Sequence, residues 1–188
     1  NAALPADGHS PALILYPSQT RAASVEYAVN RLAKEGLADP GMLTAMCYAE
    51  LSADDAGLQE ALGKADEVII LSQSVTQNKE IVKVIAQAEE AGKKTVLLGL
   101  NLPYDAACYE DTDAVLCAFQ PYGSAHDEEG NGPFNLNVAA AVCTAFGQSV
   151  PAGKLPVNVP KVTVDGDAVV YEEEYLYERG HGLKDWGK

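Results

Sequence analysis

Short apolar runs recur along the chain at regular intervals. Each run is rich in aliphatic residues and is bounded by turn-forming or charged residues, a pattern typical of strands that are buried on both faces of a sheet. The runs cover residues 12–16, 43–49, 67–72, 95–100 and 114–119. The sequence therefore predicts five buried strands.

Amphipathic segments with helical spacing lie between or after these runs. Their apolar positions are Val25, Ala28, Val29 and Leu32; Leu58, Ala61 and Leu62; Ile81, Val84, Ile85 and Ala88; and Leu136, Ala139, Ala140, Cys143 and Phe146. Gly36, Gly92 and Gly147 follow three of the segments, at the position where a left-handed cap favours glycine. Ser52 and Asp55 have the spacing of a capping box before the second segment. Four helices are expected.

Strands that alternate with helices predict the α/β class. We expect a three-layer α/β/α sandwich with a mostly parallel, flavodoxin-like doubly wound sheet and right-handed crossovers. Leu155, Val157 and Val159 alternate with Pro156, Asn158 and Pro160, a pattern that suits an edge strand or a strand end. An Asp165-Gly166 turn between two alternating runs predicts a C-terminal β-hairpin at the sheet edge. Residues 1–10 read as a tag remnant and lead, and residues 11–188 as one domain.

The chain is strongly acidic. Its 188 residues carry a formal net charge of −14, and the sequence pI is near 4.4. An acidic chain without a basic patch is not expected to bind nucleic acid or an anionic membrane surface. No apolar run reaches the length of a spanning helix, and the cellular compartment is left open.

Cofactor and metal motifs are missing from the sequence. No Gly-rich dinucleotide fingerprint follows the first run, and residues 147–154 lack the context of a phosphate-binding loop. Cys47, Cys108, Cys117 and Cys143 show no CxxC spacing, so neither a metal site nor a disulfide is expected. The acidic stretch 126–129 is interpreted as a hydrated loop. We expect no cofactor and no metal.

Polar residues gather where the predicted strands end. In doubly wound sheets, ligands bind beyond the carboxyl ends of the strands. The residues at these ends are mostly neutral and suit a ligand rich in hydroxyl groups: Ser18, Gln73, Ser74, Asn101, Tyr104, Asp105, Gln120 and Tyr122. We select Gln73, Asn101, Tyr104, Asp105 and Tyr122 as candidate substrate-binding residues. No catalytic residue is assigned.

Several blocks of the chain carry a family resemblance. They read ADEVIILS at 65–72, KKTVLLGLNLPYD at 93–105, DAVLCAFQPYG at 113–123 and AAAVCTAFGQSVPAGKLPVNVP at 139–160. With the Gly-His-Gly-Leu ending at 180–183, they resemble the C-terminal α/β sandwich domain of glycoside hydrolase family 3. The Asn-Leu-Pro-Tyr-Asp block at 101–105 is similar to the Asn-Pro-Tyr-Asp of its β-N-acetylhexosaminidase branch, with Leu102 as a departure.

The resemblance also indicates what this chain lacks. In that family the nucleophilic Asp belongs to an N-terminal (β/α)8 barrel, which needs about 250 residues. The β-glucosidase branch places its acid/base Glu in a Glu-Gly-x-Asp-Arg pattern, whereas residues 73–84 read QSVTQNKEIVKV, and Glu80 is not assigned that role. The resemblance implies an accessory domain that packs beside a barrel of the same parent chain, acts on a β-linked sugar only as part of that parent, and is inactive alone.

Two other interpretations stay open. A free-standing flavodoxin-like domain that binds a small molecule would explain the fold equally well, with its pocket at residues 101–105 and Tyr122. A hydrolase that uses Cys108 as nucleophile is disfavoured because no nucleophile-elbow sequence surrounds this cysteine.

Overall fold

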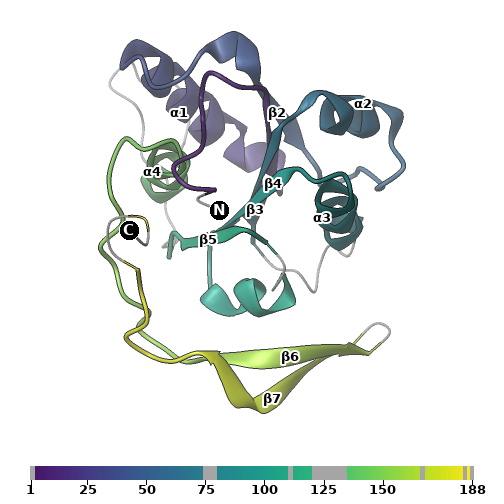
Figure 1. The fold of residues 1–188 in the computed structure, drawn as a ribbon, viewed down its shortest axis with the longest axis vertical. Coiled ribbons are helices and arrows are strands. Elements are labelled where there is room, and N and C mark those ends of the chain that lie inside the picture. The colour runs from purple at the N-terminus through teal and green to yellow at the C-terminus, as the bar shows by residue number, and fades with distance from the viewer. Residues whose placement is uncertain are drawn as a thin grey trace.

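The computed structural model describes residues 3–73, 80–109, 112–119, 135–165, 168–183 and 186. Its centre is a five-stranded sheet in the order β2-β1-β3-β4-β5, in which all neighbours run parallel (Figure 1). The strands are β1 (Ala12–Tyr16), β2 (Leu43–Cys47), β3 (Glu67–Ser72), β4 (Lys94–Gly99) and β5 (Ala114–Cys117). The predicted doubly wound α/β class is confirmed.

Helices cover both faces of the sheet, as Figure 1 shows. The helices are α1 (Ala22–Lys34), α2 (Ala56–Lys64), α3 (Glu80–Glu90) and α4 (Leu136–Ala145). Successive side chains of a strand point to opposite faces. Ile69 and Leu71 of β3 therefore join the core under α1 and α4, whereas Val68 and Ile70 join the core under α2 and α3. Two apolar layers result, and they define a three-layer sandwich.

Glycine ends the helices as expected. Gly36, Gly92 and Gly147 follow α1, α3 and α4 with φ values of 71°, 69° and 86°. The predicted capping box before α2 is wrong, because Asp55 itself is the N-cap and its carboxylate accepts the backbone N–H groups of Gly57 and Leu58. One acidic side chain thus satisfies two free donors of the first turn.

The buried face of α4 differs from the prediction. Leu136 is 57% exposed, and Ala140 is exposed as well. The helix instead buries Val138 and Val142, together with Ala139, Cys143 and Phe146 of the expected set. A helix that is apolar on most sides carries little directional information in its sequence, so packing against α1 and the sheet selects the face.

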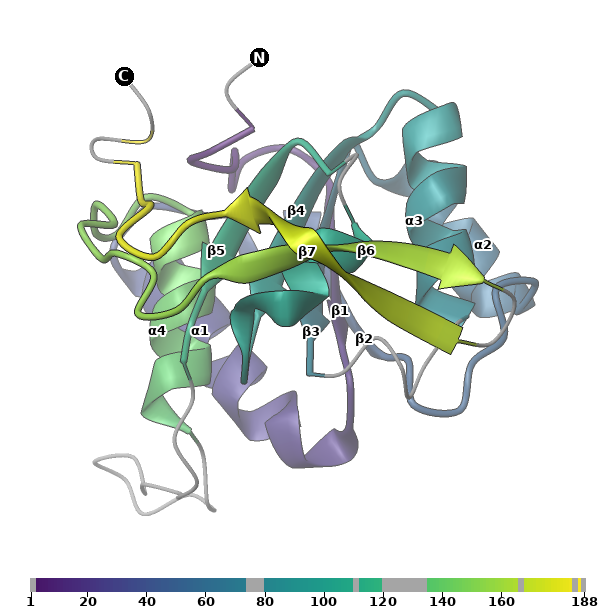
Figure 2. The ribbon, with the colours of Figure 1, turned by 90° about the horizontal axis from the view of Figure 1, so that it is seen from below.

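The C-terminal hairpin forms a sheet of its own. Strands β6 (Val159–Asp165) and β7 (Ala168–Tyr177) pair antiparallel, and neither joins the five-stranded sheet. β6 lies against the 3-10 segment η4 (Pro103–Cys108), which connects β4 to β5. Figure 2, seen from the hairpin side, shows β6 and β7 crossing in front of this segment. The hairpin is confirmed, but it packs beside the β5 side of the molecule without pairing to it.

Residues 151–158, here called the strap, connect α4 to the hairpin. The strand end offered as an alternative at 155–160 is confirmed at Val159 and Pro160, which begin β6, whereas residues 155–158 lie in no strand. Pro151 and Pro156 lack the backbone donors that a strand over the strap would need.

The lead, residues 3–10, packs into the fold. Ala3, Leu4 and Ala6 are buried in the core under α1 and α4, and the Ala6 N–H donates to the Ala145 carbonyl at 2.8 Å. Gly8 forms a bridge with Ala38. Among the described helices, none combines the length and apolar character needed to cross a bilayer.

Candidate functional site

The strand order creates a switch point between β1 and β3. The chain leaves β1 toward β2 on one side and then returns to β3 on the other, so the loops after β1 and β3 diverge at the carboxyl ends of these strands. In doubly wound sheets a ligand crevice is expected at this point. Ser18 and the 3-10 turn η1 (Gln19–Arg21) follow β1, and Gln73 follows β3. This is where a doubly wound sheet binds its ligand.

A guanidinium and an amide meet at this switch point. An Nη of Arg21 donates to the Gln73 side-chain oxygen at 3.2 Å. The hydroxyls of Ser18 and Thr20 lie 2.6 Å apart in the same turn. Burial lowers the pKa of Arg21, but a guanidinium keeps its charge at neutral pH. The group offers donors for carboxylate or hydroxyl oxygens, and Arg21 is a residue that the sequence interpretation missed.

A second polar group lies one strand further along. Ser72, the last residue of β3, donates its hydroxyl to the Asp105 carboxylate on η4. The Tyr48 hydroxyl donates to the Leu71 carbonyl at 2.8 Å, and burial followed by the nearby Asp105 charge raises the pKa of Tyr48. Tyr48 is therefore a neutral donor at physiological pH. This arrangement fixes η4 against the end of β3.

The predicted site residues do not form one cluster. Gln73 joins Arg21, whereas Asp105 joins Ser72. Tyr104 faces the hairpin, with its ring centroid 6.4 Å from that of Tyr171 and an interplanar angle of 73°. Asn101 is partly buried after β4. Tyr122, and with it Ser74, Gln120 and the acidic stretch 126–129, lies outside the described residues.

Two side chains considered for chemistry have unsuitable proton affinities. Burial, with a further contribution from Asp105, raises the pKa of the Cys108 thiol to about 11. This thiol is protonated at neutral pH and is not an activated nucleophile. A backbone hydrogen bond from Ala53 and a pair with Lys83 lower the pKa of Glu80, which is thus an ionised carboxylate at the start of α3 and no proton donor.

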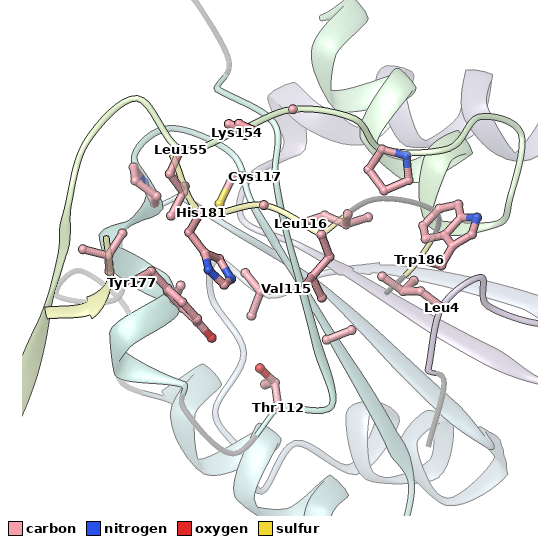
Figure 3. Close-up of a pocket in the computed structure, with 18 of the residues that line it drawn as sticks. Leu4, Thr112, Val115, Leu116, Cys117, Lys154, Leu155, Tyr177, His181 and Trp186 are labelled. Atoms are coloured by element: carbon pink, nitrogen blue, oxygen red, sulfur yellow. The ribbon is translucent and has the colours of Figure 1, made fainter. Parts of the chain in front are cut away.

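A cavity of about 590 Å³ lies beside β5, at the edge of the sheet (Figure 3). Val115 and Cys117 form one wall, Leu4 of the lead and Trp186 form another, and the strap closes the third. Tyr177 and His181 stack in the cavity with ring centroids 4.9 Å apart and 28° between the planes. Segments from both ends of the chain build this cavity, so sequence spacing gave no signal for it.

The strap is held by the segment after β7. The Leu155 N–H donates to the His181 carbonyl and the Gly180 N–H donates to the Leu155 carbonyl, both at 2.8 Å. Gly182 packs so closely that an added Cβ would collide with the Gly153 carbonyl oxygen. Two blocks that carry the family resemblance, far apart in the sequence, thus lie side by side.

The described residues contain no group of three or more His, Cys, Asp or Glu side chains that could hold a metal ion. The four cysteines are free thiols.

Comparison with known proteins supports the fold. No protein-family model matches the chain, and no curated protein matches it. A solved structure of a fungal multi-domain GH3 β-N-acetylglucosaminidase, described as containing a GCN5-related glucosamine N-acetyltransferase region, is similar with a TM-score of 0.61 and 20% sequence identity. The similarity covers 90% of this chain and 18% of the fungal chain, so this chain corresponds in size to one region of that protein.

Proposed function

We propose that this chain is an accessory α/β sandwich domain of a family 3 glycoside hydrolase of the β-N-acetylhexosaminidase kind. In this proposal it packs beside a catalytic (β/α)8 barrel of the same parent chain. The barrel supplies the nucleophile and the acid/base group that retaining hydrolysis of a β-linked sugar requires. The parent is the enzyme, and this domain contributes no catalytic residue.

One observation carries the proposal: the strap and the 180–183 block pair through the backbone of Leu155. The strap and residues 180–183 each resemble a separate motif of the family. Their pairing gives the two motifs a common structural role, because together they close the domain. Similarity over 90% of the chain to a region of a GH3 β-N-acetylglucosaminidase agrees with this assignment. Fold similarity alone does not carry function, so the argument depends on the motif residues.

Within the parent, the strand-end residues would face the sugar. Gln73, Asn101, Asp105 and Tyr122 offer amide, carboxylate and phenol groups that suit hydrogen bonds to sugar hydroxyls, whereas Tyr104 packs on Tyr171 and would reach the sugar only if the hairpin moved. Gln73 is the strongest candidate among the described residues, because it lies at the switch point beside Arg21.

The test starts from the gene. We expect the region upstream of this domain to encode βα repeats with a catalytic Asp, and the full-length parent to hydrolyse an aryl β-N-acetylglucosaminide. The isolated chain should be inactive. Hydrolysis by the isolated chain, or an upstream region without a barrel, would refute the proposal.

A second candidate function is small-molecule binding by this domain itself, favoured by the Arg21–Gln73 pair at the switch point. It is tested on the isolated chain by titration with N-acetylglucosamine and with acetyl-CoA, following the side-chain NMR signals of Arg21 and Gln73. Acetyl-CoA is included because the fungal protein contains an acetyltransferase region. Saturable shifts with either ligand would move this function to first place.

A further inference from the structure

A carboxyl group is buried at the amino end of the sheet, opposite the candidate site. Glu67 is the first residue of β3, and only 4% of its surface is exposed. Its Oε1 atom is buried and has no hydrogen-bond partner among the described residues. A buried polar atom without a partner is costly, and a buried charge is more costly still.

The surroundings of Glu67 disfavour its ionised form. Lys94, its neighbour in β4, is the only positive group that acts on it within the described part of the chain, and that lysine is exposed. Asp7 of the lead and Asp113 before β5 act in the opposite sense. On the β1 side its register partner is Ala12, which is apolar. The result of burial is a pKa of about 7, within the physiological range.

The lead covers Glu67. By the alternation of β3, the Glu67 side chain points to the same face as Ile69 and Leu71, and this face contains the buried residues of the lead. The carboxyl also takes a backbone hydrogen bond from Asp7. Water can therefore reach the carboxyl most directly if the lead moves away.

The lead is attached weakly enough to move. It buries two alanines and one leucine, so little apolar surface holds it in place. Besides the Asp7 N–H that donates to Glu67, its backbone hydrogen bonds to the rest of the fold, among the described residues, join Ala6 with Ala145 and Gly8 with Asp39, and an exposed His9–Asp39 pair adds one side-chain contact. Segments with few buried contacts are the first to open in a native protein.

We propose that Glu67 is a proton-controlled latch for the lead. While Glu67 is protonated, the lead stays docked on the core. When Glu67 releases its proton to solvent, the carboxylate draws in water, the lead detaches, and the cavity beside β5 loses the wall formed by Ala3 and Leu4. The cavity is thus closed at acidic pH and open at alkaline pH.

The single tryptophan of the chain reports on this movement. Trp186 lines the same cavity as Leu4 and packs against the same core, and Figure 3 shows the two side chains near each other. We expect the fluorescence of Trp186 to change between pH 5.5 and 8.5 with a midpoint near 7. Glu67→Gln should abolish the transition, whereas Glu90→Gln, the same change at an exposed position at the end of α3, should leave it intact.

Hydrogen exchange provides the second measurement. The pKa of Glu67 is about 7 while the lead is docked and 4.5 for a solvated carboxyl, so at pH 8 the protection of the Ala6 and Asp39 amides should be lower on the order of a hundredfold in the native chain than in Glu67→Gln. Gly8→Ala supplies the undocked reference, because an added Cβ would collide with the Leu37 carbonyl oxygen.

The fluorescence and hydrogen-exchange results distinguish a latch at Glu67 from a pH response of another group. A fluorescence transition that persists in Glu67→Gln would assign the signal to another group, such as His9 of the lead, whose pKa is raised by its hydrogen bond with Asp39, and would overturn the proposal. Equal protection of the lead in the native chain and in Glu67→Gln at pH 8 would overturn it as well. A transition that is lost in Glu67→Gln, together with restored protection, would establish it.

Discussion

Replacing Glu67 with glutamine should change how the stability of the domain depends on pH. The substitution keeps the shape of the side chain and removes its ability to ionise. In the folded chain the pKa of Glu67 is raised from 4.5 to about 7, mainly by burial. The protonated form is therefore favoured by folding, and its stabilising contribution is complete below about pH 4.5 and is lost as the pH rises through 7.

The size of the stability change follows from the difference between the two pKa values of Glu67. A difference of about 2.5 pH units corresponds to about 3 kcal/mol in the free energy of unfolding, of which about 2 kcal/mol falls between pH 5.5 and 8. Measurement should stay within this range, because the sequence pI is near 4.4 and a chain without net charge tends to precipitate. If the lead detaches, Glu67 becomes exposed to solvent, and the decrease in the free energy of unfolding cannot exceed the free energy needed to detach the lead.

The assay is urea unfolding followed by far-UV circular dichroism, which does not depend on Trp186. The native chain and Glu67→Gln are measured at pH 5.5 and pH 8. We expect the native chain to lose up to about 2 kcal/mol relative to the variant over this interval. A difference between the two proteins that is independent of pH, or that favours the native chain at pH 8, would refute the reasoning about burial.

Three further substitutions test individual contacts. Asp55→Ala should lower the free energy of unfolding by about 1 kcal/mol in urea titrations because it removes the cap of α2, whereas Ser52→Ala should leave it unchanged; equal effects would contradict the assignment of the N-cap. A double-mutant cycle on Tyr104 and Tyr171 should give a coupling energy of about 1 kcal/mol, since their rings meet edge to face; strict additivity would show that the hairpin docks without this contact. Gly182→Ala should lower the melting temperature and the exchange protection of the strap, because the added Cβ would strike a backbone oxygen of the strap, and an unchanged melting temperature would argue against this close approach.

Much of the fold could be predicted from the sequence because the sheet is parallel and buried on both faces. Such strands are continuous apolar runs, and the predicted bounds of β1 and β3 agree with the structure. The glycines after α1, α3 and α4 fixed the helix ends. The buried face of α4 was not predicted correctly, because apolar residues lie on most sides of this helix. Residues 155–158 of the strap were also misjudged, because they alternate like a strand although a proline cannot donate a backbone hydrogen bond.

The candidate site was predictable in location but not in its pairings. The carboxyl ends of the strands follow from topology, and so does the position of Gln73. The partners of the predicted residues come from segments far apart: Arg21 is 52 positions from Gln73, and Ser72 is 33 positions from Asp105. From sequence alone, a glutamate at the start of a strand is expected to be exposed to solvent. The burial of Glu67 under the lead could therefore not be predicted.

The segment η4 links the hairpin to the carboxyl edge of the sheet. One of its residues, Tyr104, contacts Tyr171 of the hairpin, and the next, Asp105, accepts the Ser72 hydroxyl. Because these two residues are adjacent in one 3-10 segment, a shift of the hairpin that carries η4 with it would also change the Ser72–Asp105 hydrogen bond. If this domain packs beside a barrel through its exposed hairpin face, the geometry of the strand-end residues depends on that packing, and the isolated domain and the parent would differ first at Asp105.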